Sequence, residues 1–273
     1  VVERGAASAA VAALAAVPAT ERANGGVRLA TALATARHAA GLAALADGQA
    51  TSALALLDDA GRDASGDQAV AIKCDAALAA VATGDRDRAL ARLKAIAKLR
   101  CPFPAPADAQ AVPILTAFVD GLNPRRAGKA ADKLAGLTRT ASGASKALAG
   151  SALRVVAMTA AEQAYRAGKL DVARKHLAAA RAVESRAGAD ELAYDLAALD
   201  LADGKLAEAR AGFARVAARV PEALIGAGIV ADRDGDSAKA LELWRQAQKA
   251  GARLGVLDDW IAAKERILGG GAP

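Results

Sequence analysis

A glycine recurs along this 273-residue chain at intervals that indicate a repeated structural unit. The intervals are 36, 37, 47, 36 and 31 residues, and the glycines are Gly48, Gly84, Gly121, Gly168, Gly204 and Gly235. In most copies an alanine follows five residues later, and Leu, Phe or Trp four residues after that; the copy around Gly121 is weaker. A self-similar period in the thirties with helical patterning is typical of stacked helical hairpins.

The physics of one unit follows from its residues. The glycine ends an alanine-rich helix by taking the left-handed conformation, and a nearby Asp, Ser or Thr caps the next helix. The alanine lets the second helix approach the first, and the large residue fills the gap between them. The chain is 54% hydrophobic but only 3% aromatic. Its apolar residues are mostly alanine and leucine, which are strong helix formers. We therefore expect an all-α protein in which neighbouring hairpins stack to cover each other's apolar faces.

This pattern resembles the tetratricopeptide repeat (TPR) family. In that family a small residue lies seven positions before the turn glycine, and alanine, a large apolar residue and another small residue lie five, nine and twelve positions after it. The first copy matches with Gly41, Gly48, Ala53, Leu57 and Ala60. The last copy matches with Gly228, Gly235, Ala240, Trp244 and Ala247. The resemblance covers about 27–250 and implies a right-handed α-solenoid of about six antiparallel helical hairpins.

The whole chain, 1–273, is predicted to be one such solenoid. We expect a partial repeat helix at 3–17 and a capping helix at 256–268 with Trp260 facing inward. The proline-rich segment CPFPAPAD (101–108) is expected to be an extended connector. The chain opens on Val1 and is interpreted as a fragment of a longer protein. The predicted hairpins are 27–63, 67–100, 107–140, 143–183, 188–220 and 221–250.

Motifs that could carry chemistry are explained better by the repeat. The segment ADRDGDSAKALELW (231–244) suggests a calcium loop that starts at Asp232. Such a loop needs glycine at its sixth position and glutamate at its twelfth, where this chain has Ser237 and Leu243. The two histidines and two cysteines lack the spacing of a metal site, and no acid–base pair can be nominated. We therefore predict no enzyme activity, no cofactor and no metal.

The cysteines and the apolar runs give weak information about the compartment. We expect Cys74 and Cys101 to be two unbridged thiols, with one bridge in an exported protein as the alternative. No uncharged run reaches the length of a membrane span, so no transmembrane segment is expected. The composition is typical of a bacterium with a GC-rich genome, and a soluble protein of the cytoplasm is favoured over a periplasmic one.

The TPR resemblance implies a partner-binding groove on the inner face of the first helices. We expect that face to be apolar in its N-terminal half and mixed in its C-terminal half, which suits a protein or peptide partner. The alternative is that these side chains are buried. The predicted groove residues are His38, Leu42, Leu45, Cys74, Leu78, Val81, Leu115, Phe118, Met158, Glu162, Tyr165, Arg166 and Tyr194.

Positive charge is concentrated in one part of the chain. Arg125, Lys129 and Lys133 are four residues apart and form one stripe on a helix, with Arg126 beside it. This basic patch could be a solvated outer face or a docking site for an anionic partner. Nucleic acid is not favoured because aromatic residues for base stacking are missing there.

These observations predict a non-enzymatic scaffold for protein–protein interaction. Two alternatives stay open: the chain could be the regulatory or sensor tail of a larger enzyme, such as a bacterial protein kinase. It could also be a structural module that self-assembles into a homo-oligomer through an exposed N-terminal hairpin.

Overall fold

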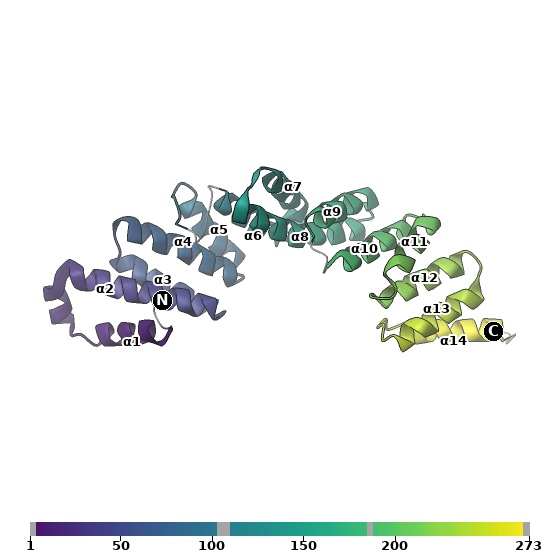
Figure 1. Cartoon of the computed structure of the whole chain (residues 1–273), viewed down its shortest axis with the longest axis horizontal. Helices are drawn as coiled ribbons and strands as arrows, with labels where there is room; N and C mark the ends of the chain where they lie inside the picture. The colour runs from purple at the N-terminus through teal and green to yellow at the C-terminus, as the bar shows by residue number, and fades with distance from the viewer. Residues whose placement is uncertain (1–3, 103–109, 185–187, 270–273) are drawn as a thin grey trace. The chain divides into compact units, whose positions relative to one another are not determined.

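A computed structural model describes residues 4–102, 110–184 and 188–269, and every element in these ranges is helical (Figure 1). The helices are α1 (Arg4–Ala15), α2 (Ala19–Ala46), α3 (Ala50–Asp63), α4 (Gly66–Ala82), α5 (Arg86–Ile96), α6 (Ala111–Gly121), α7 (Pro124–Thr140), α8 (Gly143–Arg166), α9 (Leu170–Val183), α10 (Ala189–Ala202), α11 (Leu206–Val216), α12 (Glu222–Arg233), α13 (Ser237–Lys249) and α14 (Leu257–Leu268). The predicted all-α helical repeat is confirmed.

Five of the six predicted turn glycines end a first helix in the left-handed conformation. Gly48, Gly84, Gly168, Gly204 and Gly235 have φ between 70° and 86°. At the first of these turns the amide of Gln49 donates to the carbonyl of Ala44 over 2.9 Å, and the turns at Lys169, Lys205 and Asp236 repeat this bond. This geometry satisfies carbonyls that the helix end would leave without partners.

The sixth glycine differs from the prediction. Gly121 is the last residue of α6, is buried, and is not among the residues with positive φ. The turn there is made by Asn123, whose side chain accepts a hydrogen bond from the amide of Arg125, and by Pro124 at the first position of α7. A proline at this position is pre-organised for a helix start, so this copy needs no left-handed glycine.

The small and large positions of the repeat pack against each other as predicted. Ala53, Ala89, Ala173, Ala209 and Ala240 are almost fully buried between the helices of their hairpins. A Cβ on Gly41 would lie 2.8 Å from Cγ of Leu57, and one on Gly228 would lie 2.3 Å from Nε1 of Trp244. The glycine at the small position is thus required by the large side chain opposite.

Capping by side chains is less regular than expected. Asp85 and Asp236 cap α5 and α13 by accepting hydrogen bonds from the amides of Arg88 and Lys239. The residues before α3, α9 and α11 are Gln49, Lys169 and Lys205, and none makes a side-chain cap. Those three helix starts depend on the turn and on packing instead.

Ion pairs link successive hairpins. Arg86 of α5 donates to Asp120 of α6 over 2.9 Å, and Arg174 of α9 donates to Asp200 of α10 over 2.7 Å. Arg210 of α11 pairs with Asp234 just after α12. Each arginine lies near the start of a second helix, and each aspartate lies within four residues of the next helix–helix turn, so one kind of pair recurs from hairpin to hairpin.

The chain divides into two compact units, Val1–Ala152 and Leu153–Pro273. In the first unit one core cluster joins Leu54, Leu57, Leu93 and Val119. In the second unit one cluster surrounds Phe213, which contacts the ring of Tyr194 at a centroid distance of 5.8 Å. The prediction of a single right-handed solenoid over the whole chain stays a prediction.

The two ends have the predicted helices. At the N-terminus α1 packs against α2, which has a non-helical residue at Gly26. At the C-terminus α14 packs on α13, and the ring centroids of Trp260 and Trp244 lie 5.5 Å apart. Of the predicted connector 101–108, only Cys101 and Pro102 lie within the described residues.

Candidate functional site

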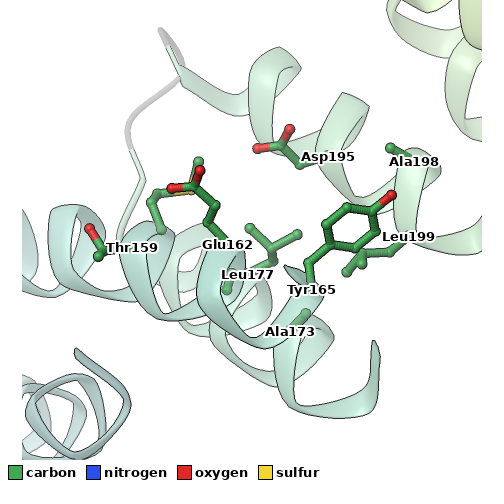
Figure 2. A pocket seen from close by; sticks show the side chains of 10 residues that line it. Thr159, Glu162, Tyr165, Ala173, Leu177, Asp195, Ala198 and Leu199 are labelled. Atoms are coloured by element: carbon green, nitrogen blue, oxygen red, sulfur yellow. The ribbon is translucent and has the colours of Figure 1, made fainter. Parts of the chain in front are cut away.

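Residues of the second unit that lie on three first helices, α8, α10 and α12, line two adjoining cavities. The first cavity has a volume of about 460 Å³ and lies among α8, α9 and α10. The predicted groove residue Met158 of α8 lines it. Glu162 and Tyr165 of the same helix line it as well (Figure 2). Asp195 of α10, which is not among the predicted groove residues, also lines it.

The second cavity has a volume of about 370 Å³ and lies among α8, α10 and α12. It shares Tyr165 and Ala198 with the first cavity, so the two cavities adjoin; together they are here called the α8–α10–α12 groove. The residues that line the second cavity are Tyr165, Tyr194, Ala198, Leu201, Ala202, Phe213, Glu222, Ile225, Gly226, Ile229, Arg233, Arg253 and Leu254. Most of this lining is apolar or aromatic, as in ordinary ligand sites.

Burial shifts two titratable groups in this groove. Burial, and secondarily the charge of Glu191, raise the pKa of the Asp195 carboxyl. Burial, followed by the charges of Asp195 and Glu222, raises the pKa of the Tyr194 phenol. The phenol therefore stays protonated at neutral pH and keeps a hydrogen to donate, while Asp195 gains from any positive charge placed beside it.

Two of the predicted groove residues pair with each other. Nη2 of Arg166 donates to Oε1 of Glu162 over 2.5 Å, one helical turn away. Both side chains are more than half exposed, so this pair contributes little to stability and can exchange partners at small cost.

The predicted N-terminal half of the groove is less exposed than its C-terminal half. Cys74 and Leu115 are buried, so neither presents a side chain to a partner. Leu42 is 41% exposed. Leu45, Leu78, Val81 and Phe118 are partly buried against the core of the first unit. His38 is also partly buried, and its Nε2 lies 2.7 Å from Oδ2 of Asp75, which joins α2 to α4.

The prediction of two unbridged thiols is wrong. Cys74 of α4 and Cys101, which follows α5, form a disulfide with their Cα atoms 5.7 Å apart. Cys74 packs in the core cluster and Cys101 against it. The bond thus fastens the end of the second hairpin to its first helix.

The basic patch lies beside a groove in the first unit. A cavity of about 520 Å³ among α5, α6 and α7 has Leu93, Ala117 and Ala130 in its wall. Its charged lining is Lys94, Asp120, Arg126, Lys129 and Lys133. Arg125 is exposed but is not part of this lining, whereas Lys94 belongs to it and was missed.

The negative charge of Asp120 in this α5–α6–α7 groove is balanced by two arginines of the chain. Burial alone would raise the pKa of its carboxyl, but hydrogen bonds from Arg126 and Arg86 outweigh burial and lower it. No ion pair holds Lys94, Lys129 or Lys133 within the described part of the chain. Their charges are available to an anionic partner.

Two further predictions concern metals and membranes. Within residues 4–102, 110–184 and 188–269, no group of three or more His, Cys, Asp or Glu is placed to hold a metal ion. One stretch, Leu29–Ala46 of α2, has the length and composition of a membrane span. It contains Arg37, bonded to Asp63 at 2.7 Å, as well as His38, so in this structure it serves as a repeat helix packed on α3.

Comparison with known proteins gives structural neighbours only. No protein-family model and no curated protein matches the chain. A tetratricopeptide repeat protein from Parabacteroides merdae is similar with a TM-score of 0.42 and 16% identity, over 96% of this chain and 93% of its own. The P58(IPK) TPR domain has a TM-score of 0.39 and 15% identity, over 93% and 70%. BtubC from P. vanneervenii has a TM-score of 0.35 and 14% identity, over 90% and 88%.

The helices, turns and packing described above define the class of this protein. It is an all-α helical-repeat protein built from degenerate, TPR-like hairpins. The left-handed glycine turns and the matched small and large positions are the features that carry this assignment.

Proposed function

We propose that the chain is a non-enzymatic scaffold that binds a protein or peptide partner in the α8–α10–α12 groove. One observation carries the proposal: first-helix residues from three successive hairpins line two adjoining cavities. Tyr165, half exposed, stands where the two cavities meet. Exposed aromatic residues beside apolar pockets are the usual anchors of protein interfaces.

The shape of the groove supports a peptide rather than a compact small molecule. Each cavity alone is near the lower end of the range of about 300–1,000 Å³ that ligand pockets occupy. Two such cavities in sequence, with a shared wall at Ala198, suit successive side chains of one segment.

A capture experiment with matched variants tests the groove. Ala198→Gln adds a side chain to the wall that both cavities share, whereas Val172→Gln replaces an exposed residue of α9 that lines neither. We expect partners captured by the wild type to be retained by Val172→Gln and lost by Ala198→Gln. An identical set of partners from all three proteins would contradict the groove as the binding surface.

A second candidate surface is the α5–α6–α7 groove, which suits an acidic segment. Its support is an apolar floor bordered by Lys94, Lys129 and Lys133, none of them in an ion pair within the described residues. A glutamate-rich peptide should bind there with an affinity that falls steeply with salt. Lys129→Glu should weaken that binding and Lys146→Glu, in α8 outside the cavity, should not; equal effects of the two variants would remove this candidate.

The disulfide bears on the compartment. Disulfides persist in oxidising environments and are rare in the cytoplasm. We propose that the first unit functions where Cys74 and Cys101 stay oxidised, which favours an exported protein over the cytoplasmic one expected from the sequence. Alkylation of free thiols in the cell of origin tests this: the cysteines should resist modification until a reductant is added.

A further inference from the structure

The cavity among α8, α9 and α10 combines an apolar floor with a negative rim. Ala161, Ala173, Leu177 and Leu199 are buried and form its base. Glu162 and Asp195 come from different helices and bring their carboxyl groups to the same cavity, with the Tyr165 ring beside them (Figure 2).

Among the residues that the structure describes, Asp195 has no partner for its charge. No hydrogen bond or ion pair of its carboxyl occurs among the described residues, although the group is partly buried. Its charged neighbour on α10 is Glu191, which adds further negative charge. A partly buried carboxylate without a partner costs free energy, and a cation placed beside it recovers that cost.

Glu162 can also turn to an incoming cation. Its present partner Arg166 is on the same helix, and the pair is exposed to solvent. Exposed pairs of this kind contribute little stability, so a cation held by two carboxylates at once competes with Arg166.

One type of partner side chain matches both the apolar floor and the negative rim of this cavity. Lysine and arginine lay an apolar stem along apolar surface and keep a charged head at its edge. An apolar side chain would fill the floor but bury Asp195 without a counter-charge, and an acidic one would be repelled. Arginine suits the site better than lysine, because its planar guanidinium binds carboxylates and stacks on an aromatic face such as that of Tyr165.

We propose that this cavity receives an arginine or lysine side chain of the partner, with the charged head between Asp195 and Glu162 and against the ring of Tyr165. The proposal rests on the proposed function, since it names the chemistry of the residue that the α8–α10–α12 groove selects.

The chain contains its own reporter for this event. Met158 lines the cavity and is the single methionine of the sequence, so a methyl-¹³C methionine label gives one reporter signal without assignment. N-acetyl-arginine amide should shift that signal saturably, and N-acetyl-lysine amide should do so more weakly. N-acetyl-norleucine amide and N-acetyl-glutamate amide, which lack the positive charge, should leave it in place.

Two variants of equal charge change make the test specific. Asp195→Asn should weaken arginine-amide binding about tenfold, as expected for the loss of a charged hydrogen bond. Glu208→Gln, an exposed carboxyl of α11 outside this cavity, should leave binding unchanged. Glu162→Gln gives a second reading if Asp195→Asn fails to fold by circular dichroism.

The outcomes separate this proposal from the proposed function. If norleucine amide shifts Met158 as strongly as arginine amide, or if Asp195→Asn and Glu162→Gln both bind arginine amide normally, the cation proposal is overturned while the groove survives. If no probe shifts Met158 yet Ala198→Gln still loses the partner, the cation proposal is again overturned. If Ala198→Gln keeps the partner, the groove itself fails.

Discussion

Gly228 of α12 lies where the packing has no room for a Cβ. The nearest atom of Trp244 would be 2.3 Å away, and the indole Nε1 donates a hydrogen bond to the carbonyl of Ile225 over 3.2 Å. Gly136 of α7 has open space around the corresponding atom. Tight packing therefore requires a glycine at position 228, whereas nothing in the packing requires one at position 136.

Alanine substitutions at these glycines should have opposite effects. Gly228→Ala should lower the free energy of unfolding by about 1–3 kcal/mol through overpacking. Gly136→Ala should raise it by about 0.5–1 kcal/mol, because alanine favours a helix interior. Urea denaturation measures both; a neutral result for Gly228→Ala would mean that Trp244 is not held as described.

Asp195 and Asp120 should respond to pH in opposite senses. The folded-state pKa of Asp195 is raised, so its contribution to stability is present below the unfolded value of about 4 and is lost as pH rises through the folded pKa. The folded-state pKa of Asp120 is lowered, so its contribution is present above about 4 and is lost as pH falls.

Asparagine variants of Asp195 and Asp120 test this pH dependence of stability. At pH 7 Asp195→Asn should be more stable than the wild type and Asp120→Asn less stable, and both differences should shrink toward pH 3. Urea midpoints at the two pH values provide the check. A stabilised Asp120→Asn at pH 7 would show that Arg86 and Arg126 do not neutralise this carboxylate.

At the scale of elements, helix ends and small–large contacts could be predicted from sequence because their causes are local. Gly48, for example, makes the turn between α2 and α3, and Leu57 packs against Gly41 within the same hairpin. Gly121 ends α6 as predicted, but the left-handed conformation expected there was wrong, because Asn123 and Pro124 supply another way to start α7. The disulfide could not be predicted, since 27 residues of separation say nothing about the 5.7 Å between the Cα atoms.

The candidate site shows the same division. Met158, Glu162, Tyr165 and Tyr194 follow from the register of the repeat, and they line the groove. Asp195 is the neighbour of Tyr194 on α10 but lines the other cavity, and only the packing of α8 and α9 makes that cavity. Lys94 was missed because the fold, and not the sequence period, brings α5 and α7 to the same cavity.

Removing the disulfide should destabilise the second hairpin. Loop-closure entropy for 27 residues corresponds to about 3–4 kcal/mol of stability. A Cys74→Ala/Cys101→Ala variant should therefore have a lower urea midpoint than the oxidised wild type, and reductant should lower the wild type alone. Equal midpoints for the oxidised wild type and the variant would show that the bond contributes nothing.

At the scale of the whole molecule, the two units contain different reporters. The only tryptophans, Trp244 and Trp260, are in the second unit, and the disulfide is in the first. Each repeat of a helical array interacts mainly with its neighbours. Reduction should therefore shift the unfolding transition seen by circular dichroism more than the one seen by tryptophan fluorescence. Equal shifts would indicate that the chain unfolds as one cooperative unit.

The bond between Cys74 and Cys101 also sets how far the chain can be stretched. A molecule held at its two ends and pulled until every helix has unravelled would still keep the residues between the cysteines as a closed ring. That ring conceals about 90 Å of contour length, from 27 residues at about 3.3–3.6 Å each. Adding a thiol during the pull should release this length in one step.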